Sequence, residues 1–227
     1  MEKYQEENIK EFLLYRSEKE ITKPNTLKIS PVFIFFSCMV LIFIVTFQLG
    51  IVLSLGIISI FIVLAIFNFY LSIKFKKLDE SITKTQLFKS NFYFKGIHSI
   101  SHSIIFLALS IEFMYIYGIR NKEMLLIMIA LYVFVIIMNI LIILFKIKKR
   151  LYKKVINYKG KKKPIELISI IGFSIVIIGF FIVEAISMYY LLLYVTFCAM
   201  ILSCMFLLVG IKFLTKYFYL NKTNLDL

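Results

Sequence analysis

The sequence contains few acidic residues, few histidines and few cysteines. Against 27 Lys and Arg there are 13 Asp and Glu, and the chain has two His, three Cys and no Trp. Cys38, Cys198 and Cys204 all lie in apolar runs and form no C-x-x-C pair. We therefore expect buried free thiols and no disulfide framework.

The signatures of several enzyme classes are also absent. The chain has no P-loop, no G-x-S-x-G elbow, no protein-kinase set and no paired-glutamate motif of the intramembrane metalloprotease kind. The two histidines lie at the inner end of their predicted span, whereas the three cysteines lie well away from that end along theirs. This placement argues against a Cys–His peptidase. We expect a protein that is not an enzyme, uses no cofactor and does not hydrolyse ATP itself.

Charge is missing from long stretches of the chain. Hydrophobic residues make up 61% of it and the mean hydropathy is +0.90, whereas an ordinary soluble domain is about 45–50% apolar. Residues 29–73 carry no charged side chain. As one helix this run would extend about 67 Å, against a hydrocarbon core of about 30 Å. It must fold back, and the polar, flexible point is Gln48–Gly50.

The apolar runs predict an all-α, polytopic integral membrane protein with six transmembrane helices in three hairpins. The expected spans are about 29–47, 51–73, 96–117, 124–145, 165–187 and 191–211. They leave an N-terminal segment, 1–28, and a C-terminal tail, 212–227. A short amphipathic helix from about Gln5 to Glu20 could lie on the membrane surface. The hairpins recur at a period of about 68 residues, which indicates a weak internal repeat or chance similarity among frequent residue types.

Positive charge predicts the orientation of these spans. The segment from Lys146 to Lys163 holds ten Lys or Arg and no acid, and short loops of this kind stay on the cytoplasmic side. With both termini inside, only Arg120 and Lys122 of the 27 basic residues would lie outside. We expect a cell-membrane protein, N-in and C-in. Its net charge of +14 needs no nucleic-acid partner.

The same basic loop predicts contact with anionic lipids of the inner leaflet. Each basic residue near such a surface contributes about 1 kcal/mol. The residues expected to make this contact are Lys148, Lys149, Arg150, Lys153, Lys154, Lys161, Lys162 and Lys163.

Two glutamates lie inside predicted spans, where charged residues are rare and are functional candidates. Glu112 and Glu184 each come shortly before an outer turn, and Gln48 marks the corresponding end of the first span. Together these three residues could line an outward-facing vestibule that binds a cation or a cationic peptide, or that carries a proton. The alternative is that each glutamate reaches the outer interface or accepts hydrogen bonds from a neighbouring helix.

His98 and His102 are spaced i, i+4 at the inner start of the third span, so both lie on one helix face. Two imidazoles can begin a metal site, but a transition metal needs a third or fourth ligand. Only Glu166 or loop acids could supply it, so we expect no metal. The alternative is a polar face shared with the neighbouring serines.

Other lone polar residues inside the spans predict hydrogen bonds between helices, of about 0.6 kcal/mol each on average. They are Asn68, Ser110, Asn139, Ser174, Thr196 and Ser203.

Three functions fit these features. The first, which we expect, is a permease or transporter subunit that works with a separate ATPase docked on the inner loops. Six spans with both termini inside resemble the architecture of small permeases of bacterial peptide-export and self-protection systems, although the last outer turn is shorter here. The second is a stand-alone immunity or accessory protein that binds a cationic, membrane-active peptide or the receptor of that peptide. The third is a membrane-embedded enzyme built on His98 and His102. The abundance of Ile, Lys and Asn suggests a low-GC bacterium.

Overall fold

The computed structural model of the chain describes residues 2–14, 51–76, 83–116, 122–149, 151–152 and 188–223. The regular structure in these ranges is helical throughout, so the all-α prediction is confirmed for this part of the chain. Its helices are α1 (Glu2–Leu14), α3 (Ile51–Lys76), α4 (Lys84–Ile116), α5 (Lys122–Lys148) and α8 (Met188–Thr223). The predicted spans 29–47 and 165–187, with Gln48 and Glu184, lie outside the described residues.

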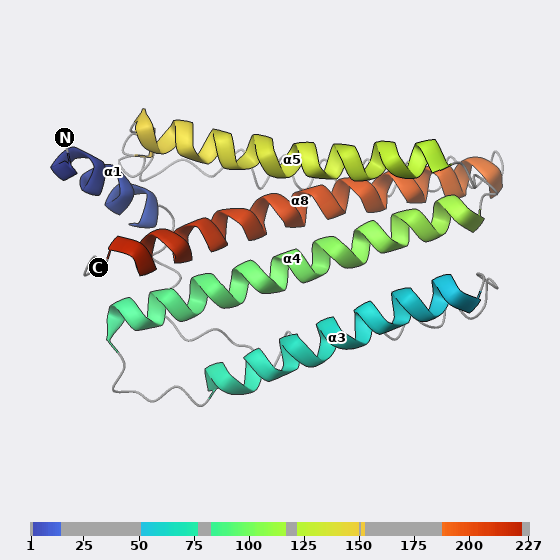
Figure 1. Cartoon of the computed structure of the whole chain (residues 1–227), viewed down its shortest axis with the longest axis horizontal. Coiled ribbons are helices and arrows are strands. Elements are labelled where there is room, and N and C mark those ends of the chain that lie inside the picture. The colour runs from blue at the N-terminus through green and yellow to red at the C-terminus, as the bar shows by residue number, and fades with distance from the viewer. Residues whose placement is uncertain are drawn as a thin grey trace.

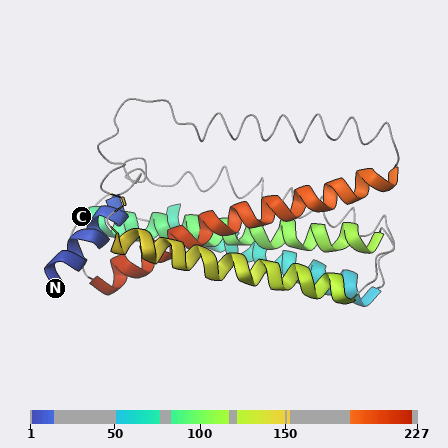
Figure 2. The same cartoon turned by 90° about the horizontal axis from the view of Figure 1, so that it is seen from above.

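The four long helices lie side by side in the order α3, α4, α8, α5 (Figure 1). The central pair, α4 and α8, is antiparallel and makes by far the most extensive contact among the described helices. Helix α3 packs on α4, and α5 packs on α8. Helix α1 contacts α5 and α8 at the end of the bundle where α8 ends (Figure 2). The α4–α8 pair is therefore the axis of the structure.

Three of these helices are long and apolar enough to cross a bilayer, with spans at Thr85–Met114, Leu125–Lys148 and Tyr194–Lys222. Helix α3 adds a shorter apolar segment, Ile58–Lys74. Only 6% of the α5 span is buried inside the protein. Because its outward side chains are apolar, the natural neighbour of this surface is lipid. The chain is a multi-pass membrane protein.

Two helices extend well beyond the spans predicted for them. Helix α4 has 33 residues and α8 has 36, which corresponds to about 50 and 54 Å at 1.5 Å per residue, against about 30 Å for a bilayer core. The basic loop expected before residue 96 is thus mostly helix α4, and the expected tail from residue 212 continues helix α8 to Thr223. The bounds of α3 and α5 lie within three residues of the predicted ones.

A reciprocal cap explains the early start of α4. The Thr83 hydroxyl accepts a hydrogen bond from the Gln86 N–H, and the Gln86 side-chain oxygen accepts one from the Thr83 N–H, both at 3.3 Å. This is the capping box, in which each of two residues at a helix N-terminus accepts, with its side-chain oxygen, a hydrogen bond from the backbone N–H of the other. The run T-K-T-Q therefore begins the helix at Lys84, well before the apolar span.

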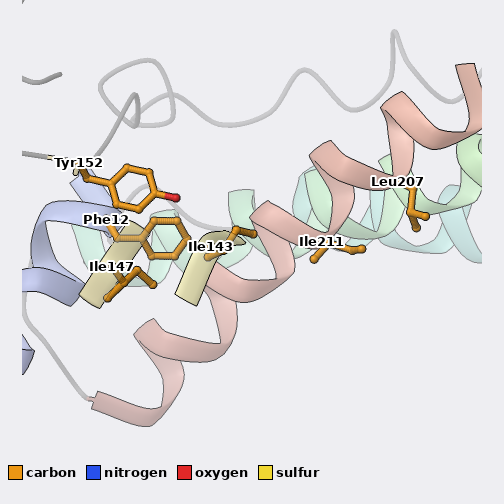
Figure 3. Close-up of a cluster of buried hydrophobic side chains, with 6 residues drawn as sticks. All are labelled: Phe12, Ile143, Ile147, Tyr152, Leu207 and Ile211. Atoms are coloured by element: carbon orange, nitrogen blue, oxygen red, sulfur yellow. The ribbon is translucent and has the colours of Figure 1, made fainter. Parts of the chain in front are cut away.

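The described N-terminal helix, α1, begins three residues before the amphipathic helix expected at about residues 5–20, and residues 15–20 lie outside the described ranges. Its apolar side chains Phe12 and Leu13 pack on protein. Phe12 and Leu13 are completely buried. Figure 3 shows the Phe12 ring beside Tyr152 and Ile147 at the end of α5. The centroid of the Phe12 ring is 5.0 Å from that of Tyr152 and 6.3 Å from that of Tyr219 in α8. A hydrophobic core thus forms between α1, the end of α5 and α8.

Lys216 of α8 is buried within this core and caps α1. Its ammonium donates a hydrogen bond to the Leu13 carbonyl at 3.1 Å, in the last turn of α1, where carbonyls lack intrahelical partners and favour a cation. The same Nζ lies 5.0 Å from the centroid of the Phe92 ring in α4 and 5.7 Å from that of Phe12. One lysine therefore joins α1, α4 and α8.

Candidate functional site

Two glycines, Gly96 of α4 and Gly210 of α8, lie where the two helices approach each other closely. A Cβ atom on Gly210 would lie 2.6 Å from the Ile100 side chain and 3.1 Å from the Gly96 carbonyl oxygen. A Cβ atom on Gly96 would lie 2.6 Å from the Leu214 side chain. Small residues permit such close approach between membrane helices, so these positions fix how the central pair crosses.

Hydroxyl groups continue the same contact along both helices. Ser103 and Ser203 each donate a hydrogen bond to the other's carbonyl oxygen at 2.7 Å. Further along, the Ser110 hydroxyl donates to the Thr196 carbonyl at 3.0 Å. We call this line of small residues between α4 and α8 the seam. Its members recur every seven residues on each helix and pair as Gly96 with Gly210, Ser103 with Ser203, and Ser110 with Thr196.

Helix α5 joins the seam through two polar contacts. The Tyr132 hydroxyl lies 2.6 Å from the Ser103 hydroxyl, and it is the donor because the Ser103 proton goes to the Ser203 carbonyl. The Asn139 amide donates to the Leu208 carbonyl at 3.2 Å. The interhelical hydrogen bonds predicted for Ser110, Asn139 and Ser203 are therefore confirmed.

Asn68 connects α3 with α4. Its Nδ2 donates to the Leu64 carbonyl at 2.8 Å and to the Ser101 hydroxyl at 2.9 Å. Its Oδ1 lies 3.1 Å from His98 Nδ1, so this ring nitrogen carries the proton and donates. The Ser101 hydroxyl in turn donates to the Ile97 carbonyl at 3.0 Å. The network satisfies every polar atom of the Asn68 side chain.

The two histidines lie on one face of α4, as their spacing predicted. Their ring centroids are 4.3 Å apart in an edge-to-face arrangement. His102 donates from Nδ1 to the His98 carbonyl at 2.9 Å, and its ring stacks on Phe206 of α8 at 5.2 Å. Within the described residues, no group of three His, Cys, Asp or Glu side chains is placed to hold a metal ion. The contacts of both rings are those of helix packing.

Glu112 is different from the polar residues above. Its side chain is completely buried within the span of α4, and both carboxyl oxygens have no hydrogen-bond partner among the residues that the structure describes. It lies two turns beyond Ile105, on the stripe of α4 whose Ile105 packs on Phe61 of α3. Glu112 lies two residues before the end of this span at Met114. Ionisable side chains inside membrane spans are rare and are candidates for function.

The other predicted site residues are only partly described. Glu184 and Gln48 lie outside the described residues, so the three-residue vestibule stays a prediction. Of the basic residues expected to contact anionic lipid, Lys148 and Lys149 are exposed at the end of α5. The others of that set lie outside the described ranges.

Sequence reasoning missed two features of this arrangement. The seven-residue spacing of small residues is visible on each helix, at 96, 103 and 110 and at 196, 203 and 210. Its meaning required the pairing of the two helices. The second feature is the burial of Lys216. No sequence pattern indicated it, because Lys216 lies in the segment 212–227, which was expected to be a basic C-terminal tail.

The fold and its polar groups define an all-α, multi-pass membrane protein with a buried carboxyl in one span. Comparison of the chain with protein-family models, with curated proteins and with solved structures finds no match in any of the three. Function must therefore be argued from the site itself.

Proposed function

We propose that this protein is a membrane permease in which Glu112 binds the transported or coupling cation. The observation that carries the proposal is the complete burial of Glu112 inside a span, with neither carboxyl oxygen hydrogen-bonded in the described part of the chain. Ionisable residues in such positions mark ion pathways and proton relays in transport proteins. The hydrogen bonds of Asn68, Ser103 and Ser203, which join α3, α4 and α8, supply the frame that holds this helix.

The basic end of the bundle supports an orientation for this permease. Every lysine in the described helices except Lys122 lies toward the end that carries α1 and the C-terminal end of α8. Because basic segments resist translocation, we place this end in the cytoplasm. The exposed Lys148 and Lys149 then lie beside the anionic inner leaflet.

A separate ATPase stays a prediction. The chain has no P-loop of its own, so energy for transport has to come from a partner or from an ion gradient. The helical projection formed by α1 and the ends of α4 and α8 is the surface on which such a partner would dock.

Charge movement in reconstituted membranes tests the proposed role. The full chain is placed in vesicles on a solid-supported membrane, and the solution is switched rapidly between buffers that differ in Na⁺, K⁺, guanidinium or H⁺. We expect a transient current for at least one of these cations. Glu112→Gln removes the negative charge at similar volume, and we expect it to reduce this current about tenfold or more, as the loss of a charged contact of 1.5–3 kcal/mol implies.

Glu123→Gln is the matched control, because Glu123 is exposed in the first turn of α5. It should leave the current within about twofold of the unmodified protein, as expected for a solvated surface charge. If no cation produces a current, or if Glu112→Gln gives the same current as the unmodified chain, the proposed function is wrong.

A further inference from the structure

No group in the described structure donates a hydrogen bond to either carboxyl oxygen of Glu112. Among the α4 side chains that the structure describes, the nearest other titratable group is His102, about 15 Å away along the helix axis at 1.5 Å per residue. On α8, Tyr194 and Cys198 flank the level of Ser110 and Thr196; both are acids that ionise only to anions. Helix α5 begins near this end with Lys122 and the exposed Glu123, and the described α3 side chains that titrate, Tyr70 and Lys74, lie toward the opposite end.

The burial of both oxygens limits the forms that the carboxyl can take. An ionised carboxylate without donors is far more costly in an apolar interior than the neutral acid, which has no net charge to desolvate. No lysine, arginine or backbone N–H in the described residues donates to Glu112. The neutral form is therefore the one that fits this conformation of the bundle.

The ligand chemistry around Glu112 also discriminates among cations. Hard metal cations require several oxygen ligands, six or more for Ca²⁺ or Mg²⁺. In the part of the chain that the structure describes, no group of three His, Cys, Asp or Glu side chains is placed to hold a metal ion, here or elsewhere. A proton needs a single carboxyl oxygen and no further ligand.

We infer that Glu112 carries a proton when it is buried as in this structure and that the coupling ion of the permease is that proton. This inference rests on the proposed function for its transport role. When water reaches Glu112, the carboxyl O–H bond breaks, the proton passes to a water molecule and the electron pair stays on the carboxylate oxygen. Burial of the carboxyl as in this structure requires the reverse step, the return of a proton to the carboxylate, so each cycle can move one proton between the site and the water that reaches it.

Infrared spectroscopy of the reconstituted full chain tests the inference. At neutral pH in lipid vesicles, a protonated carboxyl gives a C=O stretching band that is well separated from the bands of ionised carboxylates. The spectrum of the unmodified protein minus that of Glu112→Gln should contain this band. The same difference taken with Glu123→Gln should lack it. In D₂O buffer the band should shift downward as the proton exchanges.

Two results overturn the inference. One is a difference spectrum that shows ionised carboxylate bands and no protonated band, which would mean that Glu112 is ionised in the folded protein. The other is a protonated band that does not shift after prolonged D₂O exposure under transport conditions, because a coupling proton must exchange. The spectra do not depend on the current measurement, so an exchanging band without any cation current would reject the permease and keep the protonated carboxyl. A current that depends on Glu112, in a protein whose spectrum lacks the protonated band, would keep the permease and reject the protonated carboxyl.

Discussion

Alanine at Gly210 is expected to destabilise this protein, although glycine to alanine inside a helix normally stabilises by about 1 kcal/mol. The new Cβ would lie 2.6 Å from the Ile100 side chain and 3.1 Å from the Ile100 nitrogen and the Gly96 carbonyl oxygen. Backbone atoms cannot move aside without separating the two helices. Overpacking of this kind typically costs about 1–3 kcal/mol, and separation would also lengthen the paired serine hydrogen bonds.

Thermal unfolding in mild detergent, followed by the loss of the monodisperse peak on size-exclusion chromatography, measures the effect. The matched control is Gly56→Ala in α3, because a Cβ at Gly56 would meet nothing within 4 Å. Gly56→Ala should leave the midpoint unchanged or raise it, whereas Gly210→Ala should lower it by several degrees. A midpoint that moves in the same direction for both variants would contradict the close α4–α8 approach.

Truncation of Phe12 should release α1 from the bundle. Phe12 is completely buried against Tyr152, Tyr219 and the Lys216 ammonium. Replacing a buried phenylalanine with alanine costs about 3–5 kcal/mol, and α1 has only 13 residues, too few for a stable isolated helix. The loss is therefore expected to undock and unfold α1 while the membrane spans remain intact.

Hydrogen–deuterium exchange with mass spectrometry distinguishes local from global loss. In Phe12→Ala, peptides from α1 and from the C-terminal third of α8 should exchange much faster, by about a hundredfold or more in α1 for a loss of 3–5 kcal/mol. Peptides from the α4–α8 seam should be unaffected. Leu14→Ala, at a side chain that is 38% exposed, is the control and should change α1 exchange little. Equal exchange of α1 in Phe12→Ala and in the unmodified protein would show that α1 does not depend on this core.

Apolar runs predicted the bounds of α3 and α5 well, because both helices are apolar almost throughout and turn polar where they end. Apolar runs did not predict the start of α4 or the end of α8. These two segments carry lysines and aromatic residues, and they pack on α1 and on each other. The capping run T-K-T-Q was readable and would have moved the start of α4 to Lys84. The extension of α8 depended on tertiary contacts that no local pattern contains.

The candidate site was predictable in kind but not in detail. Glu112 could be singled out because charges inside spans are rare. Its complete burial and the absence of a donor among the described residues depend on how several helices meet around it. The predicted histidine pair is real as a pair, yet its partners are Asn68, a backbone carbonyl and stacked aromatic rings. Spacing alone could not separate that role from a metal site.

The register of α4 against α8 fixes the position of the helix that carries Glu112. Cysteine cross-linking in native membranes measures this register in a chain whose three natural cysteines are replaced with alanine. Oxidation should join S103C to S203C and S110C to T196C within one chain, since these pairs face each other in the seam. S110C and S203C, offset by about 10 Å along the axis, are beyond disulfide reach and should stay reduced. Cross-linking of that offset pair, with none between S103C and S203C, would contradict the structure.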